Sequence, residues 1–144
     1  MTRHDSGRYK LKHADQPTVD PLIFRAVSEK ISDGGITCAG AHKIAIALSI
    51  SPSKVGKSLD LMEKRIRKCQ LGFFGYQPER RIIKPAPQVS PALADVLKAA
   101  SSAGRVTCLR VWEIADRFSI SRLEAAAACE ALDLKVAACQ LGAF

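Results

Sequence analysis

The chain has 144 residues and a formal net charge of +8, and 47% of its residues are hydrophobic while 25% are charged. This balance is typical of a folded water-soluble protein, and no apolar run approaches the roughly 18 residues of a membrane span. The opening residues 1–16 are polar and lack the apolar core of a signal peptide. Composition thus argues against a membrane protein and predicts a cytoplasmic location.

One stretch of the sequence occurs twice, seventy positions apart and without a gap. Ile36-Thr37-Cys38 matches Val106-Thr107-Cys108, and Cys69-Gln70-Leu71-Gly72-Phe73-Phe74 matches Cys139-Gln140-Leu141-Gly142-Ala143-Phe144. Such a repeat predicts two small domains of about sixty residues each rather than one larger fold. Domains of this size bury only about 60% of their unfolded surface. We therefore expect the two copies to pack on each other, or the chain to dimerise.

The repeat and the proline pattern predict the domain boundaries. We expect a disordered basic arm at 1–16, a first domain at 17–84, a proline-rich linker at 85–90 and a second domain at 91–144. The arm is either a contact for phosphate or only a solubilising tail. Residues 87–144 carry six Lys or Arg and six Asp or Glu, so the whole positive excess precedes them. A polyanion would therefore meet the first copy, its arm and the linker.

The elements of the first copy follow in order along the chain. Asp20 before Pro21 is an N-cap followed by proline, which predicts a helix that ends at Gly34-Gly35. A turn at Ser49-Ile50-Ser51 separates two further helices, because Ser51 before Pro52 repeats the capping pattern. The remaining predicted elements are a strand at Ile36–Cys38, helices at about Gly40–Leu48 and Pro52–Lys64, a strand at Ile66–Phe74 and a returning strand at Arg80–Lys84.

This order predicts a mainly α fold with short β hairpins, built as two tandem winged helix-turn-helix units from an internal duplication. The second copy shows no returning strand up to Phe144, so we expect its wing to be truncated, with the hairpin either absent or completed by another segment. The segment from Gly35 to Glu63, with its small-residue helix, its Ile50-Ser51 turn and its Leu59-Asp60-Leu61-Met62-Glu63 ending, resembles the DNA-binding domains of LysR-type and molybdate-responsive bacterial regulators. The resemblance implies a winged helix-turn-helix that binds DNA.

A helix-turn-helix places the start of its third helix in the major groove. Lys and Ser at helical spacing suit contacts with phosphate and guanine, and basic residues in a wing reach the DNA backbone. The predicted DNA-binding residues are Ser53, Lys54, Lys57, Ser58, Lys64, Arg65, Arg67, Lys68, Arg80, Arg81 and Lys84.

The second copy lacks this basic pattern. Lys54 is replaced by Glu124 and Lys57 by Ala127, in a helix that is rich in alanine. A carboxylate is repelled by phosphate, whereas small residues allow another helix to approach closely. We therefore interpret the second copy as a docking or dimerisation module, which binds a second copy of the chain or a protein partner.

Four of the five cysteines, Cys38, Cys69, Cys108 and Cys139, occupy the same two positions of the repeat. Three interpretations remain open: small buried core residues, a redox-switchable thiol pair, or ligands of zinc or an iron–sulfur cluster. No close Cys-x-x-Cys pair supports the metal site. Cys129 has Leu59 as its counterpart and is expected in the core.

The sequence shows no phosphate loop, no Ser-His-Asp set and no carboxylate pair at useful spacing, so we expect neither an enzyme nor a bound cofactor. The leading hypothesis is a DNA-binding protein, a transcriptional regulator that contacts DNA through its first repeat. The alternative is a redox- or metal-responsive adaptor, which would use the paired cysteines and bind a protein partner.

Overall fold

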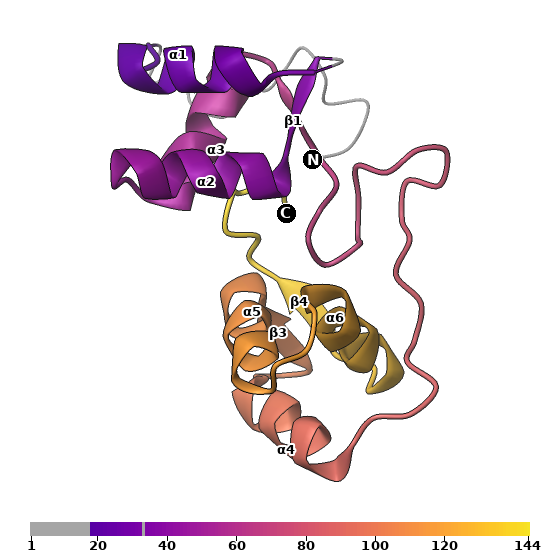
Figure 1. Cartoon of the computed structure of the whole chain (residues 1–144). Coiled ribbons are helices and arrows are strands. Elements are labelled where there is room, and N and C mark those ends of the chain that lie inside the picture. Colours follow the sequence, from indigo (N-terminus) through magenta and orange to yellow (C-terminus); the bar gives the residue numbers. More distant parts are fainter. Residues whose placement is uncertain (1–17, 33) are drawn as a thin grey trace. The chain divides into compact units, whose positions relative to one another are not determined.

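The computed structural model describes residues 18–32 and 34–144, which form six helices and four short strands (Figure 1). These elements belong to two compact units. The first contains the described residues up to Cys69 together with Gln140–Phe144, and the second contains Gln70–Cys139. The predicted basic arm at 1–16 lies outside the described residues. Within the described residues, every helix is too short or too polar to span a bilayer.

Two of the three helices in the first unit begin where the capping residues predict. The side chain of Asp20 accepts a hydrogen bond from the amide of Leu22 at 2.8 Å, and that of Ser51 accepts one from Lys54 at 3.2 Å. A proline follows each cap at the first helical position, where it costs no hydrogen bond. The elements of this unit are α1 (Pro21–Lys30), β1 (Gly35–Thr37), α2 (Cys38–Leu48), α3 (Pro52–Leu61) and β2 (Arg65–Arg67).

The turn between α2 and α3 is short and tightly bonded. Ser49 has a left-handed backbone with φ 54° and ψ 43°, which ends α2. The amide of Ile50 then bonds to the carbonyl of Ala45 at 2.9 Å. The predicted turn at Ser49–Ser51 is thus confirmed. The three helices contact one another in pairs and enclose a core that includes Ile23, Val27, Ile36, Ile44, Val55 and Leu59.

The strands do not form the predicted hairpins. In the described residues β1 pairs with β2 in parallel, with Ile36 opposite Ile66, and Arg80–Lys84 is not a strand. The strand predicted at Ile66–Phe74 stops after Arg67 because Lys68 has a positive φ of 49°. The first strand ends at Thr37, whose hydroxyl accepts a hydrogen bond from Gly40 at 2.9 Å. Cys38 therefore opens α2 rather than closing the strand.

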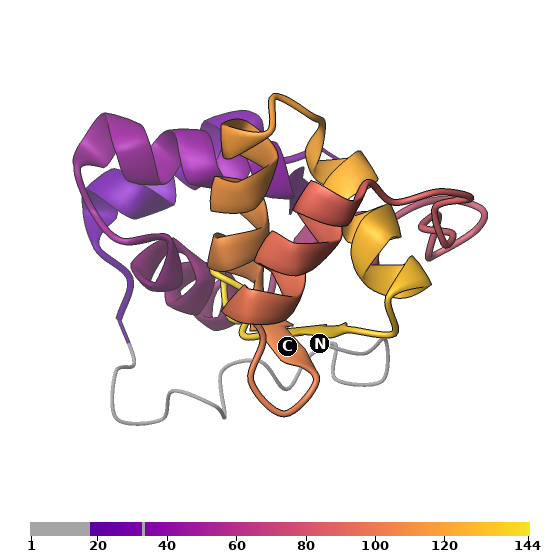
Figure 2. The ribbon, with the colours of Figure 1, turned by 90° about the horizontal axis from the view of Figure 1, so that it is seen from below.

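The second unit repeats these elements at the seventy-residue offset (Figures 1 and 2). Its strands again pair in parallel, and α5 packs against both α4 and α6. Residues with a positive φ recur at the same offset, for example at Ser49 and Ser119 and at Lys68 and Ala138. The elements are α4 (Pro91–Ala100), β3 (Arg105–Thr107), α5 (Cys108–Arg117), α6 (Arg122–Ala131) and β4 (Lys135–Ala137).

From the third residue after each final strand, the chain belongs to the unit of the other copy. We call Gln70–Phe74 the first tail and Gln140–Phe144 the second tail. The first tail belongs to the unit of α4–α6, and the second tail belongs to the unit of α1–α3. Leu71 and Leu141, at matching positions, are 0% and 1% exposed. The predicted domains keep each tail with its own copy, whereas the compact units exchange them.

Candidate nucleic-acid interface

The start of α3 presents three of the predicted residues on one exposed surface. Val55 and Leu59 are fully buried and fix the inner face of the helix. Ser53, Lys54 and Lys57 lie on the outer side and are exposed. They stand in the first turns of the helix, where the partial positive charge of the helix N-terminus adds to that of the two ammonium groups. This surface is suited to an anionic partner.

Ser58, also predicted as a DNA contact, does not belong to that surface. The residue is only 5% exposed, and its hydroxyl donates a hydrogen bond to the carbonyl of Lys54 at 2.9 Å. It lies three positions after Val55 and one before Leu59, on the side of the helix that faces the core. A hydroxyl at such a site bonds to the preceding turn of its own helix.

The basic residues after α3 have different surroundings. Arg65 and Lys68 are exposed, whereas Lys64 and Arg67 are half-buried. Lys64 lines a hollow of about 770 Å³ together with apolar residues such as Phe24 and Met62. The predicted series from Lys64 to Lys68 is therefore not one continuous basic surface.

The three basic residues predicted for a wing lie in the second unit. Arg80, Arg81 and Lys84 are exposed, but they follow the first tail and form no strand. The guanidinium of Arg81 donates a hydrogen bond to Glu130 and lies 5.0 Å from the centroid of the Phe73 ring. The prediction of a wing is wrong for these residues, and Arg81 instead holds its segment against α6.

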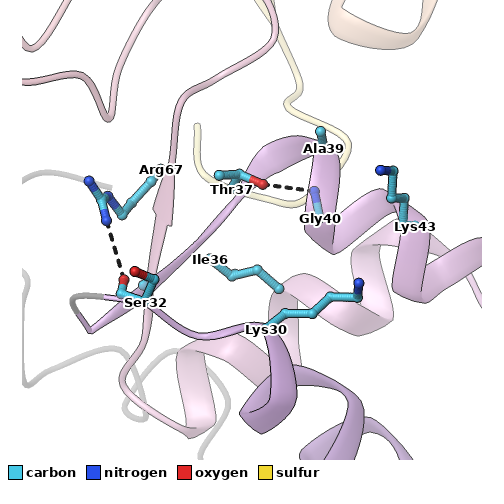
Figure 3. A pocket seen from close by; sticks show the side chains of 9 residues that line it. Lys30, Ser32, Ile36, Thr37, Ala39, Gly40, Lys43 and Arg67 are labelled. Atoms are coloured by element: carbon cyan, nitrogen blue, oxygen red, sulfur yellow. Dashed lines mark hydrogen bonds between the residues drawn. The ribbon is translucent and has the colours of Figure 1, made fainter.

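A pocket of about 300 Å³ lies at the junction of β1 and α2. Figure 3 shows Lys30 and Lys43 on one side of this junction and Arg67 on the other, where its guanidinium donates to the carbonyl of Ser32 at 3.2 Å. The first turn of α2 also lines the pocket, and there the amide of Gly40 donates a hydrogen bond to the hydroxyl of Thr37. Three cationic side chains and a helix N-terminus around one pocket create a positive potential that favours a phosphate or similar anion.

Arg67 is among the residues predicted from the sequence, whereas Lys30 and Lys43 are not. No family model, no curated protein and no solved structure matches this chain. The sequence nevertheless distinguishes the three cationic residues of the pocket when the two copies are compared. The counterparts of Lys30, Lys43 and Arg67 in the second copy are Ala100, Glu113 and Ala137. All three cations of the pocket are therefore specific to the first copy, as are Lys54 and Lys57 on α3.

One face of α6 is covered by residues 70–86 of its own unit. The side chain of Arg122 donates to Gln70 at 3.3 Å, and the amide of Ala86 donates to the carbonyl of Ala127 at 2.9 Å. Arg122 also stacks on Trp112, with 3.6 Å between its guanidinium carbon and the ring centroid. The small side chain of Ala127 permits this close backbone approach, which a lysine such as Lys57 would obstruct.

The five cysteines are thiols, and four of them are buried; Cys139 is half-buried. No three His, Cys, Asp or Glu side chains of residues 18–32 and 34–144 form a group that could hold a metal ion. Burial raises the pKa of the Cys129 thiol from 9.0 to about 11, and the charge of Glu130 adds to this rise while a backbone hydrogen bond lowers it. This thiol remains protonated, and hence unreactive, at neutral pH.

Cys129 is expected to resist alkylation in the native protein. Iodoacetamide at pH 8 should modify the half-buried Cys139 first, and Cys129 only after unfolding, which mass spectrometry of peptides resolves. Because folding raises the pKa of this thiol, its contribution to stability is complete below pH 9 and is lost as the pH rises through about 11. Rapid native labelling of Cys129 would contradict its burial.

Proposed function

We propose that the chain is a DNA-binding protein, a transcriptional regulator, that holds DNA through its first unit. In this proposal α2, the turn and α3 act as a helix-turn-helix, and the outer side of α3 enters the major groove. The observation that carries it is the exposed group of Ser53, Lys54 and Lys57. The counterparts in the second copy are Leu123, Glu124 and Ala127, which do not suit a polyanion.

The pocket at the start of α2 supports the same proposal. Lys30, Lys43 and Arg67 surround a helix N-terminus, which is a common arrangement for phosphate contacts in nucleic-acid-binding proteins. We propose that it receives a phosphate of the DNA backbone, while α3 supplies the contacts to base edges. Few side chains on α3 can read bases, so sequence specificity is expected to be modest.

The second unit has a different role in this proposal. Its α6 carries Glu124 and Glu130, which repel phosphate, so we propose that this unit serves docking rather than contact with DNA. The helix-turn-helix of the first unit works without a hairpin wing, since Arg80 and Arg81 belong to the second unit. In this proposal the two units have different roles: the first binds DNA and the second binds protein.

A salt titration tests the proposal directly. Binding to a fluorescent random-sequence duplex is expected to weaken with salt, with a slope of log K against log salt near −5 if about six phosphates are engaged. Replacing Lys54 and Lys57 together by glutamate should weaken binding at least tenfold and make the slope shallower by about 2, because two phosphate contacts are lost. Lys43→Ala, in the pocket, should make it shallower by about 1.

The control for the double substitution is Lys98→Glu with Lys135→Glu, at two exposed positions of the second unit. Both double variants change the net charge equally, so a general effect of charge would weaken binding to the same extent. Equal losses in the two variants would contradict a binding surface on α3. A binding constant that does not change with salt would exclude the phosphate contacts altogether.

A further inference from the structure

Both copies share a backbone conformation between the final strand and the tail. After each final strand comes a residue with a positive φ, Lys68 at 49° or Ala138 at 54°, and each tail contains a glycine with a positive φ, Gly72 at 82° or Gly142 at 79°. Each tail begins just beyond its own strand, yet both tails belong to the unit of the other copy. The same two backbone features therefore occur in both copies, and both tails belong to the unit of the other copy.

The second tail is seated on α3 at a position where the helix has no side chain. A Cβ built on Gly56 would lie 1.8 Å from the carbonyl oxygen of Leu141, so the tail backbone occupies the space of a side chain. Leu141 and Ala143 are buried, while Gly142 between them is exposed. Alternate residues of the tail thus anchor it in the first unit. We call the surface of α3 around Gly56 the tail seat.

The first tail is held in the second unit by contacts of the same general kind. The carbonyl of Gly72 accepts hydrogen bonds from the amides of Ile82 and Ile83 at 2.9 and 3.2 Å. A Cβ on Gly72 would meet the side chain of Leu123 at 2.9 Å. Leu123 is the residue of α6 that corresponds to Ser53 on α3. In both units a leucine-glycine segment from the other copy therefore lies against the third helix.

The tail seat is formed by residues of the first copy, and its occupant comes from the second. The chain between them is a covalent link that raises the effective concentration of the tail at the seat. The link itself adds no contact between the tail and the seat. An identical tail on another molecule would make the same contacts, as in the exchange of an element between protomers. We propose that the tail seat binds the Gln-Leu-Gly-x-Phe tail of a second copy of this chain, in competition with its own.

A synthetic peptide with the sequence of residues 136–144 tests whether the seat accepts a tail from another molecule. The receptor is a chain truncated after Cys139, which has the seat and lacks the second tail. The peptide is expected to bind one-to-one with roughly micromolar affinity and to raise the melting temperature of the truncated chain. The full chain should bind it at least tenfold more weakly, because its seat is filled, and a peptide with Leu141→Asp should not bind.

Full-length variants test the same seat between two complete chains. Gly56→Leu blocks the seat and keeps the tail, whereas Leu141→Asp disables the tail and keeps the seat. Each variant alone should be monomeric, and their mixture should give a one-to-one complex in size-exclusion chromatography with light scattering. The matched control, Gly56→Leu with Leu141→Asp in one chain, lacks both parts and should bind neither variant.

The two experiments together decide the proposal. A mixture that stays monomeric at the highest accessible concentration overturns it, as does a folded truncated chain that ignores the peptide. If truncation unfolds the first unit, the peptide should restore its helical circular dichroism, and a truncated chain that stays unfolded with the peptide present also overturns the proposal. DNA binding is measured separately with Lys54→Glu and Lys57→Glu, so either proposal can fail without the other.

Discussion

Leu141→Ala is expected to destabilise the first unit by about 2–5 kcal/mol, although the residue belongs to the second copy. Leu141 is 1% exposed and lies in the unit of α1–α3. Truncation to alanine removes its buried methyl groups and leaves a cavity beside α3. Hydrogen exchange read by mass spectrometry should show faster exchange in α1–α3, with α4–α6 little changed.

The matched control is Leu71→Ala, at the corresponding position of the first copy. Leu71 is 0% exposed and belongs to the unit of α4–α6, so its loss should accelerate exchange there. The two variants thus have crossed effects, each on the unit of the other copy. If Leu141→Ala accelerated exchange mainly in α4–α6, the assignment of the second tail to the first unit would be wrong.

The effect of Gly56→Ala on the free energy of unfolding is expected to change sign when the second tail is removed. In the full chain the new methyl group would overlap the carbonyl oxygen of Leu141, so the tail must shift, at a cost of about 1–3 kcal/mol. In a chain truncated after Cys139 the overlap is absent. Alanine then stabilises the helix by about 0.5–1 kcal/mol relative to glycine.

Thermal or urea unfolding of the four proteins measures this as a double-mutant cycle. The coupling between Gly56→Ala and the truncation reports the contact between helix and tail, separately from helix propensity. A Gly56→Ala effect of the same sign and size in both backgrounds would show that the tail does not touch this position in solution. The truncated chain with Gly56 intact serves as the reference for the cost of losing the tail itself.

The helices can be predicted from the sequence because their signals are local. The cap-proline pairs Asp20-Pro21 and Ser51-Pro52 each predict the start of a helix from two adjacent residues. The structure has α1 and α3 beginning at these prolines. Val55, Leu59 and Met62 follow the spacing of an inner face. Ser58 is polar, which favours an exposed site, but its position three residues after Val55 places it toward the core.

The strands and the tails cannot be predicted in the same way. Ile66–Phe74 contains Ile66, Phe73 and Phe74, which favour strands, but Lys68 adopts a positive φ and the residues after Cys69 belong to the other unit. Such a partner lies far away along the chain, and no periodicity within the segment reveals it. Lys30 and Lys43 are single lysines on two different helices, and only the fold brings them to one pocket.

The exchanged second tail also bears on the order in which the protein is made. The ribosome synthesises domains from the N-terminus, and each usually folds once its residues have emerged. Here Gln70–Cys139 is continuous, whereas the first unit needs Gln140–Phe144, which are added after the whole second unit. The unit that begins first during translation is therefore completed last, and α3 with its exposed lysines gains its final packing only after the second unit has been synthesised.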